Sequence, residues 1–279
     1  MSPLTTTLLT AAALAVACAT LSVFVVARRW AFIGEGIAHS GFGGAGTAWL
    51  LALLFPALDG PEMQWLPYCG VVVFAGLTAV GIGAVTRGGR AGSDTAIGIF
   101  MVASVAWGFV AREAYVAHRH AQPAGWNAFF FGDPGQADPA FAAAAVLVSA
   151  AVVATVALLG KEILAYCFDP ATAEAGGVRA GFVHYLLILL VTATIVVGTR
   201  VVGSILVTAL LVLPGATSLA LSRKLSVAVG GAVALGLVAA VVGVLASTKV
   251  PYLTTGPAIV LLLFGAFVVV FVVKRVRRA

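Results

Sequence analysis

Charged residues are scarce in this sequence. They make up 9% of its 279 residues, whereas 62% of the residues are hydrophobic. Soluble domains carry about 25% charged and about 45–50% apolar residues, so a soluble protein is excluded. The composition predicts an all-α, polytopic transmembrane helical bundle that forms a single domain over residues 1–279.

Two kinds of motif are missing as well. The phosphate-binding loop Gly-x-x-x-x-Gly-Lys-Ser/Thr does not occur, so the chain is not expected to hydrolyse ATP by that route. The three cysteines, Cys18, Cys69 and Cys167, form no Cys-x-x-Cys pair and are interpreted as small buried hydrophobes. A membrane enzyme is the least favoured class, because no nucleophile–base set or closed metal cluster is found.

Long apolar runs fill most of the chain. A spanning helix needs about 20 apolar residues. Either eight or nine spans are expected, because the run 182–221 is broken only by Gly198-Thr-Arg200. The first run is interpreted as a retained helix, since it lacks a basic start. The 32 glycines are interpreted mainly as sites of close helix packing. The candidate spans are 4–27, 36–55, 66–85, 95–113, 140–160, 182–198, 201–221, 225–246 and 255–273.

Basic residues gather at the ends of the apolar runs. The positive-inside rule therefore explains the net charge of +6, and a nucleic-acid partner is not indicated. One side is taken as cytoplasmic, which places the C-terminus in the cytoplasm and, with nine spans, the N-terminus outside. We expect a multi-pass protein of the cell (inner or plasma) membrane, in contact with the lipid bilayer. The residues that mark the cytoplasmic side are Arg28, Arg29, Arg87, Arg90, Lys161, Arg179, Arg223, Lys224 and the run 274–278; Arg112, Arg119 and Lys249 are exceptions.

Glu35 and His39 form the most informative polar pair. They lie four residues apart in the run Gly34-Glu-Gly-Ile-Ala-His39, so in a helix they share one face. Ionisable groups in a span are costly and usually face a pathway or a site. The pair is either a transit site for a divalent metal ion or a structural hydrogen bond. Two ligands do not complete a tetrahedral site, so a transit site would be shared across a dimer axis.

A short helix outside the membrane is predicted near residue 170, within a connecting segment of about 161–180. Asp169 can cap its start and Pro170 fits its first position. Gly176 or Gly177 can end it. The helix is either a capped connector or a docking element for a cytoplasmic partner.

Three further features carry less weight. His118 and His120 lie in an outer loop with Asp133 and Asp138, where they either gather metal ions or only solvate the loop. His184 lies just inside the start of a span and is interpreted as interfacial. Pro214 and Gly215 interrupt the run 201–221, which indicates a kink and a candidate flexing point.

Several segments, taken in order, resemble one known family. The ordered set, from about residue 20 to 270, is similar to the membrane permease subunit of the metal-ion ABC importers that carry zinc, manganese or iron(II). The most distinctive of these segments are the one at Phe168 and the run that ends at Thr217. The segments are Gly34–His39, Asp94–Ile99, Phe131–Asp133, Phe168-Asp169-Pro170-x-x-Ala173, Val202–Gly203 with Leu211–Thr217, and Thr255–Val260.

This resemblance implies partners and a cargo. It implies a permease homodimer, two cytoplasmic ATP-binding subunits and an extracytoplasmic metal-binding protein. Glu35 and His39 fall on the family's transit-site positions, where the usual Asp is Glu. The cargo is expected to be zinc first and manganese next, with no permanently bound cofactor. The residues that fall on the ATPase-facing surface are Phe168, Asp169, Pro170, Ala173 and Gly176.

Two alternatives to an ABC importer of metal ions remain open. An intramembrane Glu/His pair would also suit a secondary carrier that couples metal movement to protons. A permease for a siderophore or a vitamin has a similar architecture. The predicted short helix argues against the first alternative, and the ordered motifs argue against the second.

Overall fold

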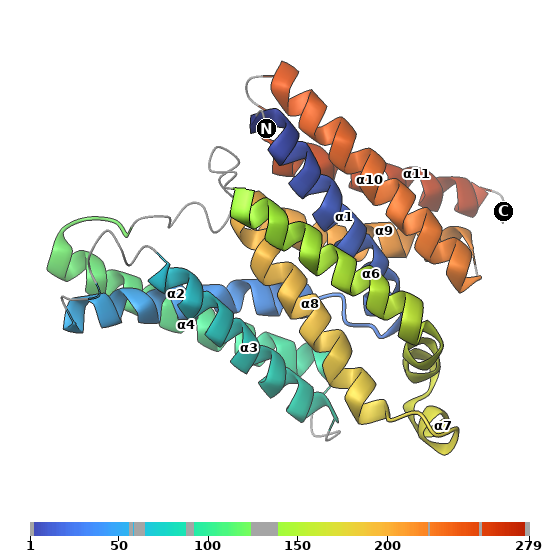
Figure 1. The fold of residues 1–279 in the computed structure, drawn as a ribbon, viewed down its shortest axis with the longest axis horizontal. Helices are drawn as coiled ribbons and strands as arrows, with labels where there is room; N and C mark the ends of the chain where they lie inside the picture. Colours follow the sequence, from blue (N-terminus) through green and yellow to red (C-terminus); the bar gives the residue numbers. More distant parts are fainter. Residues whose placement is uncertain are drawn as a thin grey trace.

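The computed structural model is a bundle of long helices (Figure 1). It describes residues 3–55, 58, 65–87, 92–123, 139–222, 224–250 and 253–276. Within these ranges, nine helices are long and apolar enough to cross a membrane. The predicted all-α membrane bundle is confirmed, with the larger of the two span counts.

The described helices are α1 to α4 and α6 to α11, in order along the chain. The short α7 is the one helix among them that is too short to span. Their bounds are α1 Pro3–Ala27, α2 Ile33–Leu54, α3 Leu66–Arg87, α4 Ser93–Arg119, α6 Pro139–Phe168, α7 Pro170–Ala175, α8 Ala180–Val202, α9 Ser204–Leu221, α10 Leu225–Lys249 and α11 Thr255–Val276.

The spanning helices form two groups that meet along α8 (Figure 1). In one group α2 packs against α3 and α4, and in the other α1 packs against α6, α9 and α10. Helix α8 contacts members of both groups, including α3, α6 and α9. Helices α1 and α2 are the most buried, so each lies at the centre of its group. Helix α2, which carries Glu35 and His39, is therefore an interior helix.

Glycines bring α2 very close to its neighbours. A Cβ atom added to Gly44 would lie 2.2 Å from the carbonyl oxygen of Gly70 on α3, and one added to Gly70 would lie 2.3 Å from that of Gly44. On α4, a Cβ added to Gly108 would lie 2.7 Å from the backbone of Phe42. Small residues allow such close backbone approach, and the resulting van der Waals packing contributes to helix association in lipid. The interpretation of glycines as packing residues is confirmed at these positions.

The break between α8 and α9 differs from the predicted one. Helix α8 continues through Gly198 and Arg200 to Val202, and the chain turns at Gly203, whose φ is 81°. Glycine adopts positive φ without the steric cost of a Cβ atom, which explains why the turn forms there. The expected break at Gly198–Arg200 was therefore placed a few residues too early.

Pro214 does not interrupt α9. The helix runs through it to Leu221. Proline is tolerated inside membrane helices because neighbouring helices and local backbone adjustments satisfy the groups that it frees. Gly215 is packed tightly, since a Cβ there would lie 2.5 Å from the backbone of Ser22 in α1. The role of Pro214 and Gly215 as a flexing point stays a prediction.

The cysteines are only partly as expected. Cys18 and Cys167 are buried, but Cys69 on α3 is exposed. Helix α3 packs along one face, with Val71 buried and Val72 exposed. An outward-facing apolar side chain meets lipid tails in a membrane and carries no penalty there. The predicted burial of Cys69 was wrong for this reason.

Candidate functional site

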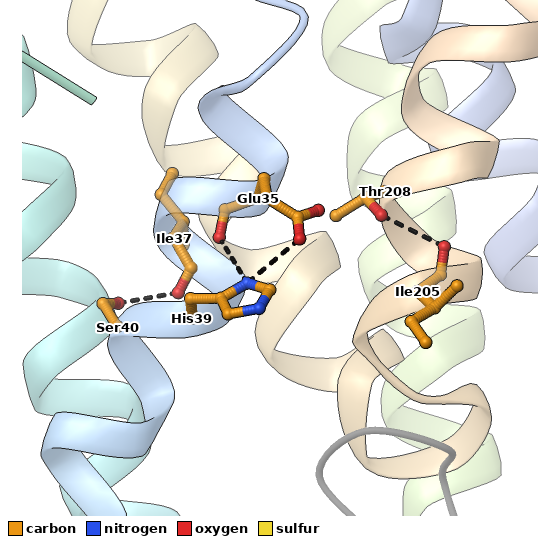
Figure 2. Close-up of polar contacts among 6 residues, drawn as sticks. All are labelled: Glu35, Ile37, His39, Ser40, Ile205 and Thr208. Carbon is orange, nitrogen blue, oxygen red and sulfur yellow. Dashed lines mark hydrogen bonds and ion pairs between the residues drawn. The ribbon is translucent and has the colours of Figure 1, made fainter. Parts of the chain in front are cut away.

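Glu35 and His39 lie on the first two turns of α2 (Figure 2). The glycines beside Glu35 hold this part of the helix against its neighbours. A Cβ added to Gly36 would lie 2.7 Å from the Ile97 side chain on α4, and one added to Gly34 would lie 3.3 Å from Leu211 on α9. The two polar side chains occupy a different face, on which 39% of the Glu35 side chain and 22% of the His39 side chain is exposed.

The hydrogen bonds of His39 define which ring nitrogen carries its proton. Its Nδ1 atom lies 3.0 Å from the backbone oxygen of Glu35 and 3.3 Å from Glu35 Oε1. A carbonyl oxygen only accepts, so Nδ1–H is the donor to it. The lone pair of a neutral ring is then on Nε2, the nitrogen that could bind a metal. A hydrogen bond from the other ring nitrogen is the usual way in which a metal-binding histidine is oriented.

Thr208 is a neighbour of Glu35 that the sequence did not single out. Figure 2 shows the Glu35 carboxylate on the α9 side of its helix, across from Thr208. The Thr208 hydroxyl donates to the Ile205 carbonyl at 3.0 Å, which leaves its oxygen as an acceptor. Threonine is a common residue type in membrane spans, so nothing in the sequence distinguishes Thr208 as a neighbour of the site.

The described residues supply only two potential metal ligands at this position. Among the described residues there is no group of three or more His, Cys, Asp and Glu side chains that could hold a metal ion. Glu35 and His39 together supply one carboxylate and one imidazole nitrogen. A transit site at this position would need further ligands from water or from a second copy.

The outer-loop histidines are not brought into a site by the described structure. His118 is exposed near the end of α4, with Nδ1 2.8 Å from the Ala114 carbonyl oxygen. His120 caps the same helix in a left-handed conformation. Asp133 and Asp138, like the family-like segment at Phe131, lie outside the described residues. Metal capture by this loop stays a prediction.

The short helix α7 forms as predicted. The Asp169 carboxylate accepts hydrogen bonds from the Ala171 N–H, at 3.0 Å, and from the Thr172 hydroxyl. Pro170 occupies the first helical position, and the Gly176 N–H donates to the Thr172 carbonyl at 3.0 Å. The helix therefore begins and ends at the residues that the sequence indicated.

The α7 segment has one buried side chain, Ala173, and one strongly exposed aromatic side chain, Phe168. Ala173 is 5% exposed, whereas Phe168, directly before the cap, is 83% exposed. Phenylalanine is among the residues that are enriched at protein–protein interfaces. The α7 segment thus combines a buried anchor with an exposed aromatic ring, and its docking on a partner stays a prediction.

The Asp169 cap should make α7 sensitive to acid. The Thr172 hydroxyl and the Ala171 N–H hold the pKa of the Asp169 carboxyl below its ordinary value. A lowered pKa in the folded state means that the cap stabilises α7 above the ordinary carboxyl pKa. We expect this stabilisation to be lost as the pH falls through the lowered pKa. Hydrogen exchange of the α7 amides, corrected for the intrinsic pH dependence, measures it. In Asp169→Asn the cap cannot titrate, and persistent acid sensitivity there would contradict this assignment.

His184 has partners that the sequence did not reveal. It is 4% exposed, and its ring contacts Trp30 and Tyr166, which come from the α1–α2 turn and the end of α6. The expected position near the start of a span is consistent with its place in α8. The cluster itself joins residues far apart in sequence, so no local pattern could have predicted it.

Comparison with known proteins places the chain in a family. The family model described as "ABC 3 transport family" matches residues 2–274. The chain belongs to this family. As an ABC-3 member it is a membrane subunit of an ABC transporter, and separate subunits hydrolyse ATP. The resemblance that the ordered motifs indicated is confirmed.

Relatives of the ABC-3 chain span nearly its whole length. A probable iron transport system membrane protein of Haemophilus influenzae is 28% identical, over 97% of this chain and 93% of that protein. The manganese transport system membrane protein MntC of Listeria monocytogenes is 29% identical, over 95% and 88%. The solved structure of PsaBC from Streptococcus pneumoniae in complex with Fab superimposes with a TM-score of 0.77, at 25% identity, over 97% of this chain and 91% of the other.

Proposed function

We propose that this ABC-3 permease imports divalent transition-metal ions, with Glu35 and His39 as ligands of a transit site. The observation that supports the proposal best is the orientation of His39. Its Nδ1–H bonds to the Glu35 backbone carbonyl and carboxylate, so Nε2 is left with a lone pair next to a partly exposed carboxylate. Imidazole and carboxylate together suit zinc, manganese and iron(II).

A second permease copy would complete the site. Two copies would supply two carboxylates and two imidazoles, enough for a four-coordinate ion. Weak, shared coordination suits a carrier that must release its ion. The homodimer is supported by the fact that the described residues of one chain bring no third His, Cys, Asp or Glu side chain to this pair.

The other partners would act at the two membrane faces. We infer that α7, with the exposed Phe168 beside it, docks on the ATP-binding subunits. An extracytoplasmic metal-binding protein would deliver the ion on the opposite face. This orientation places the C-terminal basic residues Lys274 and Arg275 in the cytoplasm of a cell-membrane protein, in agreement with the positive-inside rule.

The proposal names divalent transition metals as a class and does not single out one metal. The relatives do not favour zinc over manganese, because their names refer to iron, manganese and zinc transport. Glu35, in place of the family's usual Asp, adds one methylene to the arm of the carboxylate. This longer arm changes the reach of a ligand without changing its chemistry.

Uptake into vesicles tests the proposed function. Proteoliposomes that contain the permease with its ATPase subunits and its metal-binding protein should accumulate manganese, iron(II) or zinc only when ATP is supplied. An ATPase variant that binds but does not hydrolyse ATP is the control. Uptake by the permease alone, driven by a proton gradient, would establish the secondary carrier instead. Transport of a siderophore or a vitamin in competition with the metals would establish the third alternative.

A further inference from the structure

A buried polar and aromatic cluster lies where four helices end or begin. We call it the junction, and define it as Arg28, Trp30, Gly83, Tyr166 and His184. These residues come from the α1–α2 turn, from α3, from α6 and from the first turns of α8. Trp30, Tyr166 and His184 are 2–4% exposed. The junction therefore holds polar groups inside the protein, which is costly unless they are paired.

The imidazole of His184 is fully paired. Its Nε2 lies 3.1 Å from the carbonyl oxygen of Gly83, which can only accept, so Nε2 carries the proton. Nδ1 then accepts from the hydroxyl of Tyr166 at 2.6 Å. One imidazole thus joins α3, α6 and α8 through two directed bonds. A satisfied buried network of this kind specifies a single arrangement of the elements that it joins.

Arg28 adds the α1–α2 turn to the same assembly. Its guanidinium carbon lies 4.5 Å from the centre of the Tyr166 ring and 5.5 Å from that of Trp30. Its Nη1 donates to the Tyr166 carbonyl at 3.4 Å. No carboxylate in the described part of the chain forms an ion pair with it. Two aromatic faces and one carbonyl therefore hold this cation, and both the ring and the backbone of Tyr166 take part.

The junction lies between the two elements of the proposed transport mechanism. Tyr166 precedes Asp169, the cap of α7, by three residues, and the Asp169 N–H bonds to the Ala165 carbonyl at 3.1 Å. On the other side, the Ile33 N–H that opens α2 bonds to the Trp30 carbonyl at 2.9 Å. Glu35 follows two residues later. A continuous series of bonds and ring contacts thus leads from α7 to the first turn of the transit-site helix.

We propose that the junction is the joint that transmits movement of α7 to α2, with Arg28, Tyr166 and His184 as positioning residues for transport. The proposal rests on the proposed function, because it assumes that α7 meets the ATPase and that α2 holds the ion. When α7 moves, Tyr166 moves with the end of α6. Because Arg28 lies against the Tyr166 ring, Arg28 and the α1–α2 turn move with it. The hydrogen bonds of His184 make α3 and α8 move together with Tyr166.

The ratio of metal imported to ATP hydrolysed tests this joint. Tyr166→Phe removes the bond to His184 Nδ1 and keeps the ring that holds Arg28. We expect ATP hydrolysis to be preserved and the metal imported per ATP to fall about fivefold, the factor that corresponds to one lost hydrogen bond. Tyr185→Phe is the matched control, since Tyr185 also contacts the His184 ring but its hydroxyl has no hydrogen-bond partner among the described residues. It should leave the ratio unchanged.

A second variant keeps the test independent of one substitution. Arg28→Lys retains the charge and loses the planar group that lies against two rings, so it should lower the same ratio. An unchanged ratio in both Tyr166→Phe and Arg28→Lys would overturn the proposal. A parallel loss of hydrolysis, uptake and folded protein would overturn it too, because it would show a structural role alone. Failure of the proposed function is distinct, since the unsubstituted protein would then import no metal.

Discussion

Replacing Glu35 or His39 with alanine is expected to abolish ATP-driven metal uptake while the protein still folds and assembles. Each change removes a proposed ligand from both copies of the proposed shared site. Loss of a residue that merely orients a ligand typically costs 10–100-fold in metal affinity, so loss of a ligand itself should exceed about 100-fold. Uptake of radioactive manganese or zinc into proteoliposomes measures the effect, and size-exclusion chromatography reports on folding. Full uptake by both variants would refute the transit site.

The substitution Glu35→Gln separates a metal ligand from a structural hydrogen bond. A glutamine oxygen can still accept from His39 Nδ1–H, which lies 3.3 Å from Glu35 Oε1 in the structure. If the pair only stabilised α2, Glu35→Gln would be nearly silent. Because we assign the carboxylate to the ion, we expect Glu35→Gln to lose uptake almost as completely as Glu35→Ala.

The substitution Glu35→Asp examines the departure from the usual family residue. It retains the charge and shortens the arm by one methylene. We expect uptake to persist with an altered order of preference among manganese, iron(II) and zinc, measured by competition. An unaltered order would show that the length of this side chain does not set the choice of metal.

Replacing Gly70 with alanine is expected to disrupt the packing of α3 on α2. The added Cβ would lie 2.3 Å from the carbonyl oxygen of Gly44, and backbone atoms cannot move aside as the end of a flexible side chain can. Overpacking of a core costs about 1–3 kcal/mol, and we expect a value near the upper end, about 3 kcal/mol. Thermal unfolding in detergent and the yield of monodisperse protein would measure it.

Gly76 provides a matched control on the same helix. A Cβ added there meets no atom within 4 Å, so Gly76→Ala should leave the unfolding midpoint unchanged or slightly raised. The reciprocal change, Gly44→Ala, should resemble Gly70→Ala because its Cβ would lie 2.2 Å from the Gly70 carbonyl oxygen. Equal stability of Gly70→Ala and Gly76→Ala would contradict the close approach of α2 and α3.

Features that depend on interactions between residues close together in the sequence were predictable from the sequence. The six-residue helix α7 begins after Asp169 with Pro170 and ends at Gly176. These limits were predictable because capping residues act on the backbone next to them. The spans follow from long apolar runs in the same way. The turn at Gly203 was misplaced because several glycines in this region could have supplied it, and only the packed structure selects one.

Features that depend on contacts between distant segments were not predictable. The bonds of His184 to Tyr166 and to Gly83 join residues 18 and 101 positions apart. The exposure of Cys69 depends on which face of α3 meets its neighbours. The pair at Glu35 and His39 is intermediate, since helical spacing places both side chains on one face but only the structure shows which ring nitrogen remains available.

The bare ring of Phe168 bears on how the transporter is made. Full burial of a phenylalanine side chain is worth about 1.5–3 kcal/mol. If Phe168 docks on the ATP-binding subunits as proposed, a permease synthesised without them would leave this ring uncovered, which favours aggregation. If the proposed docking holds, we expect balanced production of the subunits and purification as a complex to protect Phe168, which is 83% exposed in the permease alone.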